Sequence, residues 1–210
     1  MKVHLVEHTS RESASREIAQ RIASAIQEEP RNHPRTTIAV SGGATPQRCY
    51  AHLCREPLPW SEVTITLTDE RCVPDDHEDS NTRMLREALL KHHARNAVFA
   101  KPSEFTFEHP FTAVLLGMGA DGHFASIFPD APEREAALDL CLPPGVLAIT
   151  TAASPYARET FNLKALTQTE HLMLLVFGED KREVLQQPTG LPIEHLLKQT
   201  HAPVQVHWAP

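Results

Sequence analysis

The segment LLGMGADGHFASIFP, residues 115–129, combines a histidine and an aspartate with glycines. Gly117, Gly119 and Gly122 satisfy the pattern G-x-G-x-x-G, which occurs in dinucleotide-binding loops. Histidine is also the side chain best suited to proton transfer near neutral pH, so His123 is a candidate general base. The segment therefore predicts either a phosphate-binding loop or a turn that carries an acid–base group.

The context of these glycines argues against a dinucleotide. Such a loop should open a long helix in the first βαβ unit, with an acidic residue about 20 positions further on. Here the glycines come mid-chain, and Pro129 and Pro132 leave room for barely two helical turns. The charge of Asp121 would also repel a pyrophosphate. The sequence instead favours a glycine-rich turn that presents Asp121 and His123; the alternative is an ordinary surface turn.

The segment SGGATP, residues 41–46, is a second candidate site. Glycine amides, two hydroxyls and the positive end of a helix that begins near Pro46 can together bind an anion. The segment lacks the G-K-[ST] signature, so it is not a nucleoside-triphosphate loop. Seen alone, it also fits an ordinary strand-to-helix turn. The candidate anion-binding residues are Ser41, Gly42, Gly43 and Thr45.

The triplet Asp69-Glu70-Arg71 is a third candidate, because it follows an apolar strand-like run. Arg71 can pair with its acidic neighbours, which is the commoner outcome for such a triplet, or face a ligand. Arg158 and Lys181 are single cations, for which a solvated surface position is the ordinary expectation. Position at a strand end favours the functional alternative for the triplet.

These segments lie between alternating strand-like and helix-like stretches. Predicted strands are 3–6, 37–40, 63–68, 97–100, 112–116, 146–150, 171–177 and the run VQVHW near the C-terminus. Predicted helices are 11–28, one from Pro46, one capped by Ser80 or Asn81, 179–187 and 192–199. This alternation predicts a single α/β domain over residues 1–210: a three-layer sandwich with a mostly parallel, Rossmann-like central sheet and helices on both faces. The three candidate segments, which contain SGGATP, Asp69-Glu70-Arg71 and the glycine-rich turn, should meet at the carboxyl ends of the strands.

Composition narrows the function classes. A net charge of -7, a pI near 6.0 and scattered basic residues argue against nucleic acid as a partner. No run approaches the roughly 18 apolar residues of a membrane span, and the N-terminus does not resemble a signal peptide. The four cysteines are irregularly spaced and the thirteen histidines are dispersed, so we expect reduced thiols, a cytoplasmic location and no metal site.

The motifs together resemble the 6-phosphogluconolactonase family. SGGATP, TDERCVP, SNTRMLREALL and GMGADGHFASIFP occur in that family's order and at about its spacing, and the resemblance runs from about Val3 to Trp208. Related sugar-phosphate deaminases typically carry DEY instead of DER, and an asparagine and a glutamate where this chain has SIFP. Both differences favour the lactonase. The chain departs from the family pattern at Phe124, usually threonine, and at Ala44, often serine.

The resemblance implies hydrolysis of 6-phospho-D-glucono-1,5-lactone to 6-phosphogluconate, in the oxidative pentose phosphate pathway, without cofactor or metal. His123 would activate water, with Asp121 or Asp69 orienting it, and Arg71 would act on the lactone side. The SGGATP loop, Arg158 and Lys181 would hold the 6-phosphate. The alternatives are a hexosamine-6-phosphate deaminase or isomerase and a non-catalytic sugar-phosphate sensor. The oligomeric state, monomer or weak dimer, stays open.

Overall fold

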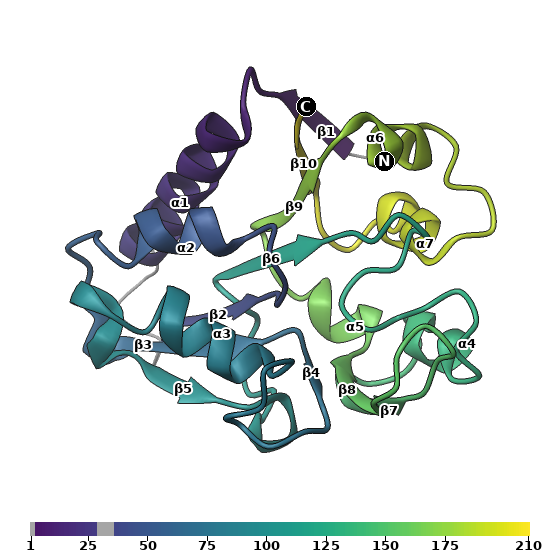
Figure 1. Cartoon of the computed structure of the whole chain (residues 1–210), viewed down its shortest axis with the longest axis horizontal. Helices are drawn as coiled ribbons and strands as arrows, with labels where there is room; N and C mark the ends of the chain where they lie inside the picture. The colour runs from purple at the N-terminus through teal and green to yellow at the C-terminus, as the bar shows by residue number, and fades with distance from the viewer. Residues whose placement is uncertain (1–2, 29–35) are drawn as a thin grey trace.

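The central element of the protein is a parallel β-sheet. A computed structural model describes residues 3–28 and 36–210, and its seven-stranded sheet has the order β1-β10-β9-β6-β2-β3-β5 (Figure 1). Every neighbouring pair in this sheet is parallel. Its strands are β1 (Val3–Glu7), β2 (Thr36–Val40), β3 (Val63–Leu67), β5 (Val98–Ala100), β6 (Ala113–Gly117), β9 (Leu172–Phe177) and β10 (Val204–Ala209). The predicted mostly parallel sheet is confirmed.

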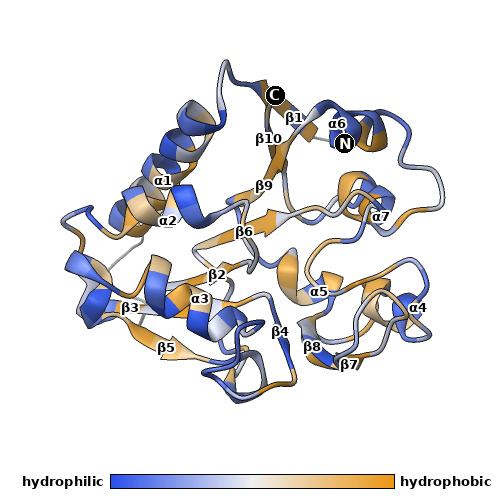
Figure 2. Cartoon of the chain, viewed as in Figure 1, coloured by the Kyte–Doolittle hydropathy of each residue, from blue (hydrophilic) through white to orange (hydrophobic). Residues whose placement is uncertain are grey.

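Both faces of this sheet are buried, which explains the apolar character of its central strands (Figure 2). In β6, Leu115 packs into one hydrophobic core and Leu116 into the other, because successive side chains point to opposite faces. The first core includes residues of α1 (Arg11–Glu28), α2 (Gln47–Leu53) and α3 (Asn81–Ala88). The second includes residues of α4 (Arg134–Leu138), α5 (Leu163–Leu166) and α7 (Pro192–Lys198). Helices on both faces confirm the three-layer sandwich.

The remaining helices are α6 (Glu179–Gln186), which has no buried residue, and the short 3₁₀ helices η1 (Trp60–Glu62), η2 (His92–Asn96) and η3 (Pro102–Glu104). Two predicted helix starts can be compared with the structure. Helix α2 begins at Gln47, so Pro46 precedes the first helical residue. Ser80, rather than Asn81, caps α3, because its Oγ accepts a hydrogen bond from the Arg83 amide at 3.2 Å.

One predicted strand is in a different sheet from the one we expected. The segment 146–150 forms β7 (Val146–Ile149), but β7 pairs antiparallel with β8 (Arg158–Phe161), which pairs antiparallel with β4 (Asp69–Arg71). Parallel pairing needs a crossover of about a dozen residues or more, and residues 150–157 are too few to provide one. Strands β4 and β8 were not predicted, because each is short and begins with polar residues. This second sheet adjoins the carboxyl ends of the central strands (Figure 1).

Candidate functional site

A polar cavity of about 230 Å³ lies where the predicted loops meet. The loops that follow β2, β3 and β6 all contribute to it, as expected for the carboxyl edge of a parallel sheet. Strand β8 adds Arg158 and helix α6 adds Lys181. The lining residues are Ser41, Gly42, Gly43, Ala44, Thr45, Asp69, Arg71, Asn81, Gly117, Met118, Gly119, His123, Ala125, Arg158 and Lys181.

His123 forms a close pair with Asp121. The distance from His123 Nδ1 to Asp121 Oδ1 is 2.6 Å, and the same oxygen accepts a hydrogen bond from the His123 amide at 3.2 Å. Burial raises the pKa of Asp121, but the hydrogen bond and charge of His123 outweigh this effect, so the pKa lies below its usual value. Asp121 therefore stays ionised and fixes the imidazole through Nδ1. Of the two acids that the sequence left open, Asp121 is the one in contact with His123.

The glycines around this pair make room for it. A Cβ on Gly119 would lie 2.3 Å from the His123 ring and 2.5 Å from Asp121 Oδ1. Gly122 has a φ of +76°, a conformation that other residues rarely adopt. No helix follows directly, since the next one, α4, begins at Arg134. The G-x-G-x-x-G pattern here thus belongs to a turn that holds a histidine–aspartate pair, in agreement with the rejection of a dinucleotide loop.

The two phenylalanines of this loop lie in different surroundings. Phe124, which departs from the family pattern, is fully buried in the second core and does not line the cavity. The Phe128 ring lies 4.2 Å from the His123 ring, centroid to centroid, and 5.2 Å from the Arg158 guanidinium carbon. Phe128 therefore packs against both a candidate base and a candidate anion-binding group, although it does not itself line the cavity.

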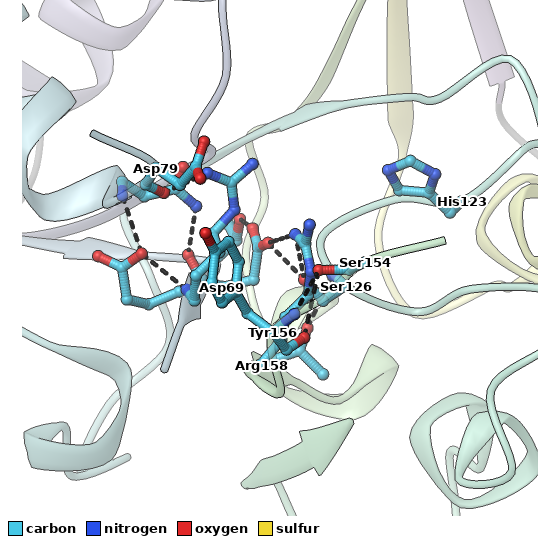
Figure 3. A network of polar contacts seen from close by, with 12 residues as sticks. Asp69, Asp79, His123, Ser126, Ser154, Tyr156 and Arg158 are labelled. Atoms are coloured by element: carbon cyan, nitrogen blue, oxygen red, sulfur yellow. Dashed lines mark hydrogen bonds and ion pairs between the residues drawn. The ribbon is translucent and has the colours of Figure 1, made fainter. Parts of the chain in front are cut away.

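Asp69 belongs to a different polar network (Figure 3). Its carboxylate is nearly buried and accepts hydrogen bonds from Ser126 Oγ at 2.6 Å and Thr68 Oγ1 at 3.0 Å. Its Oδ2 lies 3.8 Å from Arg158 Nη1. In Figure 3, His123 is separate from this network. Asp69 is thus placed to hold an arginine rather than to orient the histidine.

Glu70 points to the other side of β4 and accepts hydrogen bonds from the start of helix α3. Its carboxylate accepts hydrogen bonds from the Asn81 amide at 2.8 Å, the Thr82 amide at 2.6 Å and the Arg71 amide at 2.7 Å. The first two are donors that the first turn of a helix leaves unpaired. Glu70 therefore caps α3 and does not line the cavity.

Arg71 and Arg158 are direct cross-strand partners in the β4–β8 pair. Burial, followed by the nearby charge of Arg71, lowers the pKa of Arg158, although an arginine keeps its proton over the physiological range. The Arg71 guanidinium donates to the Asp79 carbonyl oxygen. Both Nε atoms are buried without a hydrogen-bond partner among the residues that the structure describes. Like charges placed opposite each other repel, so this wall of the cavity is built to attract an anion.

The SGGATP loop forms another wall of the cavity. Ser41 Oγ is buried and has no hydrogen-bond partner within the described part of the chain. Gly42 packs against the Asn81 side chain so closely that a Cβ would lie 2.1 Å from it, and Gly43 has a φ of +86°. Lys181 reaches the cavity from α6 and forms no ion pair with any residue in 3–28 or 36–210. These groups can donate hydrogen bonds to an anion.

The structure thus gathers every predicted site residue except Asp121 into the cavity lining, and Asp121 contacts it through His123. Two further residues of the site were not predicted. Asn81 lines the cavity and donates from Nδ2 to the Asp69 carbonyl oxygen at 3.0 Å, although the sequence suggested only a helix cap there. Ser126 lies beneath the cavity. Its place in the motif GMGADGHFASIFP was the available signal.

Residues 3–28 and 36–210 contain no group of three or more His, Cys, Asp or Glu side chains arranged to hold a metal ion. Within the same residues, no helix is long and apolar enough to cross a membrane.

Comparison with known proteins identifies the family. A family model described as "Glucosamine-6-phosphate isomerases/6-phosphogluconolactonase" matches residues 9–208. The 6-phosphogluconolactonase of Rhizobium meliloti (strain 1021) is 34% identical over 99% of this chain and 98% of its own length. That of Caulobacter vibrioides is 36% identical over 95% and 94%. The crystal structure of a 6-phosphogluconolactonase from Shewanella baltica OS155 matches with a TM-score of 0.92 and 32% identity, covering 100% of this chain and 98% of that one. The protein therefore belongs to the glucosamine-6-phosphate isomerase/6-phosphogluconolactonase family.

Proposed function

We propose that the protein is a 6-phosphogluconolactonase, which hydrolyses 6-phospho-D-glucono-1,5-lactone to 6-phosphogluconate, the second step of the oxidative pentose phosphate pathway. Relatives with this name match it over nearly their whole length at 34% and 36% identity. The observation that carries the proposal is the His123–Asp121 pair on the wall of a cavity that also presents Arg71, Arg158 and Lys181. This combination joins a base with groups that bind anions.

In the proposed mechanism, His123 is the general base. Asp121 accepts the hydrogen bond from Nδ1, which leaves Nε2 to take a proton from the attacking water. The water oxygen forms a bond to C1 of the lactone, and the carbonyl oxygen gains negative charge. When the C1–O5 bond breaks, the imidazolium returns the proton to O5. The ionised Asp121 stabilises the imidazolium between these two steps.

Arg71 is the proposed partner of the developing oxyanion, as expected from its place in the sequence. It lines the cavity, and its buried Nε has no partner in the described part of the chain. A fixed cation near the carbonyl oxygen lowers the energy of the tetrahedral intermediate more than that of the neutral lactone. Asp69 contributes indirectly, because its contacts with Ser126 and Arg158 leave it in the supporting network.

The 6-phosphate is assigned to the opposite end of the substrate. Ser41, Gly42, Gly43 and Thr45 offer amides and hydroxyls, while Arg158 and Lys181 offer charge. Binding the phosphate holds the ring in one orientation and brings C1 to the base. Hydrolysis of an ester changes no oxidation state, so the proposed steps need no redox cofactor.

The test is a direct assay on the phosphorylated lactone. The purified protein should release 6-phosphogluconate faster than the spontaneous opening of the lactone, which must be measured separately and subtracted. Glucosamine 6-phosphate serves as the comparison substrate, and ammonia release from it would favour a deaminase. Saturable binding of 6-phosphogluconate with no rate above the spontaneous one would instead favour a sensor, and the proposed function would be wrong.

A further inference from the structure

A single buried hydroxyl joins two charged groups beneath the cavity. The Ser126 side chain is fully buried, donates to Asp69 Oδ2 at 2.6 Å and accepts from Arg158 Nη1 at 3.3 Å (Figure 3). The direct distance from Arg158 Nη1 to Asp69 Oδ2 is 3.8 Å, which is longer than a hydrogen bond. Ser126 therefore provides the hydrogen-bonded connection between the carboxylate and the guanidinium.

Ser126 is itself held in place by the surrounding backbone. Its amide donates to Thr160 Oγ1 at 3.1 Å, and Thr160 is the cross-strand partner of Asp69. The preceding residue, Ala125, has a φ of +47°, which is unusual for a residue with a side chain. The backbone is thus strained at Ala125, in a conformation that brings Ser126 Oγ between Asp69 and Arg158.

Arg158 needs such an anchor more than an ordinary surface arginine does. It lies directly opposite Arg71, and the two like charges repel across the β4–β8 pair. The Asp69 carboxylate offsets this repulsion, but its other oxygen is already engaged by Thr68 at 3.0 Å. The remaining oxygen is the one that Ser126 contacts. Removing the hydroxyl would loosen both the carboxylate and the guanidinium.

We propose that Ser126 is a positioning residue for substrate binding, which holds Arg158, both directly and through Asp69, in the orientation that receives the 6-phosphate. This inference rests on the proposed function, since it assumes that Arg158 contacts the phosphate. It assigns Ser126 no contact with the reacting atoms. The predicted loss is therefore in substrate affinity and not in the chemical step.

The test is Ser126→Ala, measured as KM and kcat on the phosphorylated lactone and as Kd for 6-phosphogluconate. KM and Kd should each rise about tenfold, the effect of one lost hydrogen bond to a charged group, while kcat stays within about twofold. Ser15→Ala is the matched control. Ser15 is equally buried and donates to the Arg11 carbonyl oxygen at 2.7 Å, within α1 and outside the cavity lining. It should leave both constants unchanged.

A double-mutant cycle tests whether the effect passes through Arg158. In an Arg158→Ala background, Ser126→Ala should add little to the rise in KM. An unchanged KM in folded Ser126→Ala, or a full tenfold effect in the absence of the Arg158 guanidinium, would overturn the inference. If Ser126→Ala does not fold, Ser126→Cys replaces it in the same measurements. A wild-type protein without lactonase activity would instead refute the proposed function, so the two failures are distinguishable.

Discussion

The two sides of the cavity are positioned in different ways. On one side, Asp121 holds His123 within a turn of a few residues, and Gly119 provides the space for both side chains. On the other side, Arg71 and Arg158 come from strands far apart in the sequence, and Arg158 contacts Asp69 and Ser126. In the first arrangement, residues close in the sequence hold the side chain in place. In the second, a buried polar network between residues far apart in the sequence does so. Changes to His123 should therefore affect the chemical step, and changes to Arg158 or Ser126 should affect binding.

The largest expected effect is that of His123→Asn. Positioned general-base catalysis is worth about 10²–10⁴-fold in rate, so kcat should fall by roughly that factor. The Kd for 6-phosphogluconate should change little, because the proposed phosphate contacts lie on the other side. A folded His123→Asn protein with near wild-type kcat would reduce His123 to a turn residue.

A second substitution on the same side should displace the His123–Asp121 pair without removing either side chain. Gly119→Ala leaves His123 and Asp121 in the sequence but puts a Cβ 2.3 Å from the imidazole. The pair must shift, and a misplacement of about 1 Å can cost about 10²-fold in rate. We expect kcat to fall by about that factor with KM nearly unchanged. Gly43→Ala is a useful contrast, because an added methyl group there would meet no atom within 4 Å and only the positive φ is strained. Equal loss of kcat in both variants would contradict the special role of Gly119.

The two sides also differ in how far the sequence predicted them. The local side was recognisable because Asp121 and His123 follow an apolar run, Ala113 to Leu116, within one glycine-rich segment. The central strands were recognisable for the same reason, since burial on both faces produces continuous apolar runs. Strands β4 and β8 gave no such signal. Asp69, Arg71 and Arg158 line the cavity, and Glu70 caps α3, so these positions are polar.

Ser126 illustrates what a single sequence cannot supply. A serine in a loop looks like an ordinary turn residue, and its contacts with Asp69 and Arg158 exist only once two distant strands have paired. The same holds for the choice between Asp69 and Asp121 as the partner of His123. Spacing left both open, and the direction of the side chains decided it.

On the long-range side, Arg158→Ala should raise KM for the phosphorylated lactone about 10- to 100-fold, because a charge-assisted hydrogen bond to phosphate is lost. kcat should change far less than in His123→Asn, since the base remains in place. Arg86→Ala is a suitable control, because Arg86 pairs with Asp75 at 3.1 Å and does not line the cavity. An unchanged KM in Arg158→Ala would contradict the assignment of Arg158 to the 6-phosphate. Lys181 and the 41–45 loop would then have to bind the phosphate.

The smallest expected effect on activity comes from His207, which lies on β10 outside the cavity lining. Its side chain is fully buried, its Nδ1 lies 2.9 Å from His8 Nε2, and burial, followed by the charge of His8, lowers its pKa to about 4. His207→Gln should therefore leave kcat at neutral pH unchanged. It should, however, alter the dependence of stability on pH.

The direction of this pH dependence follows from the linkage between proton binding and folding. An unfolded histidine has a pKa near 6.5, so below that pH the unfolded chain binds a proton that folded His207 does not, and the free energy of unfolding falls. The contribution is complete above about pH 6.5 and is lost as the pH falls toward 4, by at most about 3 kcal/mol. Urea unfolding between about pH 4 and pH 6.5 measures this effect. The free energy of unfolding should depend less steeply on pH in His207→Gln than in wild type. His201→Gln, at an exposed position, is the control and should follow wild type. Parallel curves for wild type and His207→Gln would contradict the assignment.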